Sequence, residues 1–129
     1  MKSKMILVGI ISLMIIGNLA AGCGDSYDKT VQIVRNSTLA MNPNVPIGKA
    51  FDQFFANGKW RSFISTNKET IVEFNGECTW YNAPAKMRVQ FNIIDGESFM
   101  LQYVDINGVA FDFMDSASVI EKILSEYRP

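Results

Sequence analysis

The feature that most constrains the fold is a strict alternation of apolar and polar residues in "AKMRVQFNII", residues 85–94. Successive side chains of a β-strand point to opposite faces of the sheet, so this pattern predicts a strand with one buried and one solvent-facing side. The apolar positions are Met87, Val89, Phe91 and Ile93, and the polar positions between them are Lys86, Arg88, Gln90 and Asn92.

Two more runs repeat the pattern on either side of this segment. In "TIVEFNGECTWY" (residues 70–81) one face would carry Val72, Phe74, Gly76, Cys78 and Trp80. In "SFMLQYVDI" (residues 98–106) the corresponding residues are Phe99, Leu101 and Tyr103, and "RSFIST" (residues 61–66) is a candidate for a short first strand. The connections "NAP" and "DGE" are short enough for hairpin turns, which predicts an antiparallel meander with one buried face.

On the polar face of the run at 70–81, Glu73 and Glu77 are too far apart along the strand for a site with paired carboxylates. We expect them instead to pair across the strands with Lys86 or Arg88.

Helical periodicity flanks these runs. In "IGKAFDQFF" the apolar residues recur at helical spacing, Pro46 suits the first helical position, and Asn57-Gly58 suits a C-terminal cap. In "DSASVIEKILSEY" a second stripe runs from Val119 to Tyr127, with Asp115 or Ser116 as the cap. The segment "YDKTVQIVRNSTL" (residues 27–39) fits a short helix or a strand, and we favour the helix.

These patterns predict an α+β fold with two layers, in which an antiparallel meander of three or four strands packs against an N-terminal and a C-terminal helix. The expected globular domain spans residues 46–129. Residues 23–45, polar and closing in "MNPNVP", are expected to form an N-terminal spacer.

The beginning of the chain has the layout of a secretory signal. Lys2 and Lys4 precede the uncharged apolar run at residues 5–16, and the small residues of "LAAGC" (residues 19–23) follow. A membrane-spanning helix is the weaker interpretation, because Asn18 interrupts the run before it reaches about 20 residues.

"LAAGC" resembles the bacterial lipoprotein box, in which a cysteine after small residues is acylated and becomes the first residue of the mature protein. The resemblance implies removal of residues 1–22 and a lipid anchor on Cys23. It departs from the commonest box, because Ala20 stands where Leu is usual and Leu19 comes one step earlier. The alternative is that Cys23 is an ordinary thiol of a secreted protein, bridged to Cys78.

A lipid anchor on Cys23 would place the protein on a bacterial cell membrane. The Asp that retains enterobacterial lipoproteins in the inner membrane is absent after the cysteine, where Gly24 stands. We therefore expect the outer membrane, facing the periplasm, if the host has one. Loss of Lys2 and Lys4 would leave 10 basic against 13 acidic side chains, and the basic residues are scattered, so nucleic acid is not an expected partner.

The 129 residues contain no histidine. This excludes the commonest general base near neutral pH and the commonest metal ligand. Asp105, Asp112 and Asp115 do not have the spacing of an EF-hand loop. Cys78 falls on the apolar face of its strand, which favours a small buried side chain over a reactive thiol. We therefore expect no enzymatic activity, no cofactor and no metal.

Contact residues for a protein partner are expected among exposed aromatic side chains, which are enriched in protein interfaces. Trp60 and Tyr81 are the two candidates. The alternative for Trp60 is that it packs against the core at the end of the first amphipathic helix.

"IGKAFDQFF", a Trp shortly after it, "VEFNGECTW" and "VQF" together resemble a group of small bacterial exported proteins and lipoproteins of unassigned function, over residues 31–127. The architecture is also similar to that of other small envelope lipoproteins, including one attached to the machinery that assembles outer-membrane proteins. The first hypothesis is a lipid-anchored, non-enzymatic envelope protein that binds or modulates another envelope protein. The alternative is an inhibitor or exclusion factor against an external enzyme, a phage or a conjugating cell.

Overall fold

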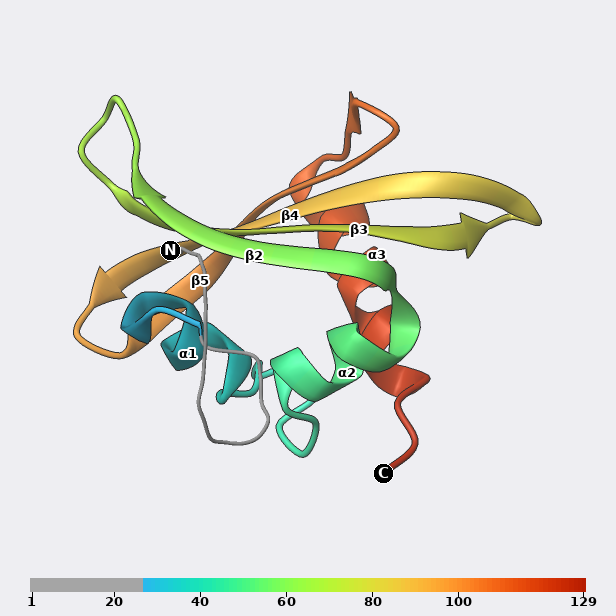
Figure 1. The fold of residues 1–129 in the computed structure, drawn as a ribbon, viewed down its shortest axis with the longest axis horizontal. Helices are drawn as coiled ribbons and strands as arrows, with labels where there is room; N and C mark the ends of the chain where they lie inside the picture. The colour runs from blue at the N-terminus through green and yellow to red at the C-terminus, as the bar shows by residue number, and fades with distance from the viewer. Residues whose placement is uncertain (1–26) are drawn as a thin grey trace, which may run out of the picture.

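The computed structural model describes residues 27–129 (Figure 1). The signal segment and Cys23 lie outside this range, so the assignments made for them stay predictions. In chain order the elements are α1 (Lys29–Arg35), α2 (Ile47–Phe54), β2 (Ala56–Ile64), β3 (Thr70–Trp80), β4 (Ala83–Asp95), β5 (Ser98–Ile106), β6 (Val109–Ala110) and α3 (Phe113–Ser125).

The strands form one antiparallel sheet in the order β2-β3-β4-β5-β6, so strands that follow one another along the chain are also neighbours in space. The α+β meander with helices before and after it is confirmed. The sheet has five strands rather than three or four. The candidate run at residues 61–66 is part of a nine-residue strand, β2, and the additional strand is the two-residue β6, which pairs with the end of β5.

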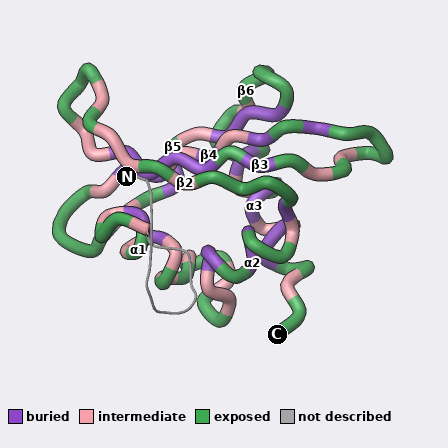
Figure 2. Tube along the Cα trace, in the orientation of Figure 1, coloured by how far each residue is buried: buried purple, intermediate pink, exposed green. Residues whose placement is uncertain are grey.

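One core joins a single face of the sheet to all three helices (Figure 2). The predicted apolar positions of β3 and β4 supply its centre, and α2 and α3 cover them with their apolar stripes. Fully buried members with the largest side chains include Phe51, Phe74, Phe91, Met87, Ile120 and Ile123.

α1 belongs to the packed domain. Its Val31 and Val34 are buried in the core, and Asp28 caps its N-terminus by accepting a hydrogen bond from the Val31 amide at 2.8 Å. Part of the stretch expected to be a spacer therefore packs with residues 46–129. The helical interpretation of this segment is confirmed.

The junction between α2 and β2 differs from the prediction. The helix ends at Phe54, and Phe55 already has extended backbone angles (φ −107°, ψ 150°). Asn57 and Gly58 therefore lie in β2, where the register with β3 shifts and Asn57 has φ 55°. The Asn-Gly pair marks a β-bulge rather than a helix cap, because Asn tolerates the left-handed conformation that a bulge needs.

α3 begins earlier than expected, at Phe113. Its N-cap is Asp112, whose carboxylate accepts a hydrogen bond from the Asp115 amide at 2.7 Å. Asp115 therefore lies in the first turn, where its negative charge interacts favourably with the helix dipole and stabilises the helix.

A register shift in β5 moves Tyr103 away from its predicted face. Leu101 pairs with Phe91, but Tyr103 pairs with Gln90, so one extra residue separates the two pairs. Val104 takes the buried position instead. A single inserted residue reverses the face of every later side chain in a strand.

The open face of the sheet buries a carboxylate without a covering helix. Glu73 is only 3% exposed. It accepts hydrogen bonds from Arg61 Nε at 2.8 Å, Gln90 Nε2 at 2.7 Å and Asn75 Nδ2 at 3.1 Å. Burial raises the pKa of Glu73, but these hydrogen bonds and the charge of Arg61 outweigh burial and hold the pKa below its ordinary value.

The expected pairing with Lys86 or Arg88 is wrong for Glu73. Glu77 does lie opposite Lys86, and its carboxylate accepts a hydrogen bond from Asn57 Nδ2 at 3.2 Å. Glu73 lies directly opposite Arg61 of β2, whereas Arg88 lies opposite Asp105 of β5 and forms an ion pair with it at 2.8 Å. Register partners are closer than diagonal neighbours, so each carboxylate takes the cation directly across from it.

Glu73→Gln is expected to lower the free energy of unfolding by about 1 kcal/mol at neutral pH, because a charge-assisted acceptor is lost. The folded pKa of Glu73 lies below its ordinary value of 4.5, so the advantage of the natural chain is present above that pH. It is lost as the pH falls through the folded pKa. Urea unfolding at pH 7 and pH 3 measures both effects, and an equal difference at the two pH values would contradict the pairing.

Candidate functional site

Of the two predicted contact residues, Tyr81 is the exposed one. It lies at the tip of the β3–β4 hairpin with 89% of its surface accessible, at one end of the molecule (Figure 1). The tip is a two-residue turn between Trp80 and Ala83, in which Tyr81 and Asn82 have φ values of 49° and 63°. Positive φ at both positions is the mark of a type I′ hairpin turn.

Tyr81 is an unfavourable residue for this conformation. Bulky side chains rarely adopt positive φ, at a cost on the order of 1–3 kcal/mol, and residues held in this way concentrate at functional sites. The ring of Trp80 supports Tyr81 in an edge-to-face contact, with ring centroids 5.6 Å apart. The hairpin therefore presents an exposed aromatic side chain on a two-residue turn.

Trp60 is placed differently. Its ring lies in the aromatic cluster of the core, with centroids 5.5 Å from Phe51 and 4.9 Å from Phe74. It is only partly exposed and packs against the buried core. We therefore leave Trp60 out of the candidate contact surface.

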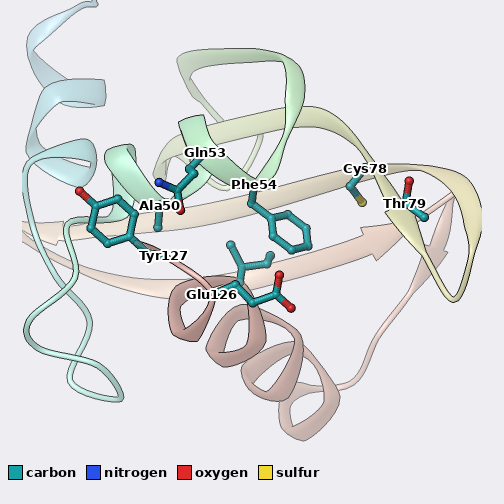
Figure 3. Close-up of a pocket in the computed structure, with 8 residues that line it drawn as sticks. Ala50, Gln53, Phe54, Cys78, Thr79, Glu126 and Tyr127 are labelled. Carbon is teal, nitrogen blue, oxygen red and sulfur yellow. The ribbon is translucent and has the colours of Figure 1, made fainter. Parts of the chain in front are cut away.

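A depression of about 320 Å³ lies near the turn end of the hairpin, between α2, α3 and the end of β3 (Figure 3). Figure 3 shows the ring of Phe54 in the middle of this pocket, with Cys78 and Thr79 beyond it on the strand. A second depression of about 520 Å³ shares these three residues and continues toward Pro84 and Lys86. The two depressions adjoin at these residues, and we call them together the distal groove; the lining reaches Thr79 and Pro84, close to the hairpin turn.

One end of the distal groove is fixed by the C-terminal segment. Gln53 of α2 donates from Nε2 to the carbonyl of Arg128 at 2.7 Å and accepts from the Arg128 amide at 2.8 Å. Glu126 and Tyr127, which line the groove, are thereby tied to α2. The groove is held by contacts between segments that lie 75 residues apart in the sequence.

Cys78 lines the groove as a half-buried thiol. Burial raises its pKa above the ordinary value, so the thiol is protonated at neutral pH. A thiol in this state is a poor nucleophile and a poor metal ligand. The side chain contributes a small apolar surface to the groove.

The acidic residues considered as calcium ligands have other roles. Asp105 pairs with Arg88, and Asp112 caps α3. Within residues 27–129, no group of three His, Cys, Asp or Glu side chains is placed to hold a metal ion.

The sequence pointed to Tyr81 but not to the groove beside it. Phe54 was assigned to the core stripe of its helix, yet in the structure it is partly exposed and forms the centre of the depression. Its position in the last turn of the helix could have indicated this exposure, because the chain leaves the helix there and continues into β2.

None of the helices in the described part of the chain is both long and apolar enough to cross a bilayer. Comparison with protein-family models, with curated proteins and with solved structures finds no match to this chain.

Proposed function

We propose that the chain is a lipid-anchored, non-enzymatic protein of the bacterial envelope that binds another envelope protein through the tip of the β3–β4 hairpin and the distal groove. The anchor rests on "LAAGC", which places Cys23 after an apolar signal segment. Acylation would hold the domain at the membrane, because two or more acyl chains bind durably where one does not.

The observation that carries the binding role is the exposed, conformationally restricted Tyr81. Tyrosine buries a large area at little cost in conformational entropy and is enriched at the centre of protein interfaces. Its position at the end of a hairpin, beside a groove lined by both polar and apolar side chains, supports a contact with a protein surface rather than with a small molecule. The groove would accept an apolar side chain of the partner next to Phe54.

The test is crosslinking and capture of the full chain from membranes of its native host. Cys23→Ala is expected to move the protein from the membrane fraction to the soluble fraction. Tyr81→Ala is expected to stay in the membrane fraction and to lose most of the crosslinked partner, since truncation of an aromatic hot spot typically costs at least about 2 kcal/mol, or roughly 30-fold in affinity.

Phe113→Ala is the matched control, because Phe113 is an exposed aromatic residue (69%) outside the groove. Its crosslinked partner should be retained. Equal capture by Tyr81→Ala and the natural chain would overturn the hairpin as the contact surface. A deletion strain that is sensitive only to an external enzyme, a phage or a conjugating cell would favour the exclusion factor instead.

A further inference from the structure

The first described residues are fastened to the domain. The carbonyl of Tyr27 accepts a hydrogen bond from Gln32 Nε2 at 2.8 Å, and its ring lies 4.4 Å from the guanidinium of Arg35. The second carboxylate oxygen of Asp28 accepts a hydrogen bond from Ser62 Oγ of β2 at 2.8 Å. The chain is therefore fixed to α1 and β2 from Tyr27 onward.

Arg35 extends this attachment to α2. Its guanidinium donates to both carboxylate oxygens of Asp52, at 3.0 and 2.7 Å, and lies 5.5 Å from the ring of Trp60. Gly48 permits this approach, because a Cβ there would lie 2.8 Å from Arg35 Cβ. The position of Tyr27 is thus tied to two helices and to an edge strand.

Three residues separate Cys23 from Tyr27, and the four residue steps between the two Cα atoms span at most about 14 Å even when fully extended. An acyl anchor on Cys23 would therefore keep the surface around Tyr27 beside the lipid headgroups. We propose that this surface, formed by the start of α1 and the adjacent edge of β2, faces a phospholipid bilayer. The inference rests on the proposed acylation of Cys23.

The charges on this surface suit a bilayer with anionic phosphates. Lys29 is exposed and forms no ion pair within residues 27–129. The nearby carboxylate of Asp28 is engaged by the Val31 amide and Ser62, and that of Asp52 by Arg35. A cation close to anionic lipid favours binding to the bilayer.

This orientation has a consequence for the hairpin. Figure 1 shows α1 toward one end of the molecule and the β3–β4 tip at the opposite end. Tyr81 would then lie at the end of the domain away from its anchor, where a neighbouring envelope protein can reach it.

The orientation is tested with an environment-sensitive fluorophore on the acylated full chain in vesicles that contain nitroxide-labelled phospholipid. The fluorophore is attached to Lys29→Cys or to Tyr81→Cys, both in a Cys78→Ala chain so that the introduced thiol is the one labelled. Quenching at residue 29 is expected to exceed quenching at residue 81 several-fold, because nitroxide quenching acts only near the lipid. Circular dichroism of each labelled protein checks that the fold is retained.

The possible outcomes separate the two proposals. If the protein floats with the vesicles but residue 29 is quenched no more than residue 81, the orientation is wrong while the anchor stands. If the acyl-competent chain does not float, the anchor fails, and the orientation fails with it.

Discussion

Phe51→Ala is expected to lower the free energy of unfolding by about 3–5 kcal/mol, the range for truncating a buried aromatic side chain. Phe51 is fully buried on α2 and touches four other rings, with centroid distances of 4.9 Å to Phe74, 5.5 Å to Phe55 and Trp60, and 6.4 Å to Phe91. No neighbouring backbone can move in to fill the space, because the four rings belong to three strands and to the junction between α2 and β2. The free energy of unfolding of a small domain is about 5–15 kcal/mol, so this one change would remove a large part of the stability.

Urea unfolding followed by far-UV circular dichroism measures the effect, since Trp60 fluorescence would also report the local loss of its neighbour. Phe113→Ala serves as the control, because an exposed aromatic side chain should change the stability by less than about 0.5 kcal/mol. If Phe51→Ala does not fold, Phe51→Leu should show a smaller loss. A loss below about 1 kcal/mol for Phe51→Ala would contradict the central place of this ring.

Much of the fold follows from the alternation of residues in the sequence. Val89 and Phe91 lie on the buried face of β4 as the period of two requires, and Ile120 and Ile123 face the core from α3. These elements were predictable because their burial depends on local periodicity alone. Tyr103 was assigned to the wrong face, because one extra residue in β5 leaves no mark in the hydrophobic pattern.

Contacts between strands were harder to predict. The partners of Glu73 depend on the register of β2 against β3, and that register includes a bulge at Asn57. A run such as "RSFIST" predicts that a strand exists but not where it begins. In the structure the strand begins at Ala56. Without the length, Arg61 could not be placed opposite Glu73.

The candidate site shows the same division. Tyr81 was named from the sequence because aromatic residues are enriched in protein interfaces. The sequence pattern placed it at the end of the strand at residues 70–81, with the turn at "NAP", whereas the structure places it in the turn itself. The groove beside it was not found, because Phe54, Cys78 and Ile123 come together only when α2 and α3 pack against the end of β3. A surface made by distant segments has no pattern within any one of them.

Gly76 gives a second large effect from a small change. Its position in the middle of β3 would normally weaken a strand, and replacing such a glycine by alanine would add about 0.5–1 kcal/mol. Here a Cβ would lie 2.6 Å from Phe74 Cζ and 3.0 Å from Phe55 Cβ. The Phe74 ring lies over the glycine backbone on the same face, so the site has no room for a methyl group.

We therefore expect Gly76→Ala to lower the free energy of unfolding by about 1–3 kcal/mol, the cost of overpacking a filled core. The ring cannot swing aside, because its centroid lies 4.8 Å from that of Phe55 and 4.9 Å from those of Phe51 and Trp60. In a strand with room for a methyl group, Gly→Ala would instead raise the free energy of unfolding. The direction of the change at residue 76 is therefore a direct test of this contact.

A double-mutant cycle assigns the cost to the ring. In a Phe74→Leu chain the side chain over residue 76 lacks the far ring atoms, so adding the methyl group there should cost less than in the natural chain. The coupling energy is expected to be about 1 kcal/mol or more, measured from urea unfolding of the two single variants and the double variant. Additive losses would mean that the methyl group clashes with something other than Phe74.

Because a Cβ at Gly58 would also lie 2.8 Å from Phe74 Cε1, the same cycle with Gly58→Ala should give a coupling of the same sign. Agreement between the two cycles would establish that Gly58 in the bulge of β2 and Gly76 in β3 both leave the space that the Phe74 ring occupies.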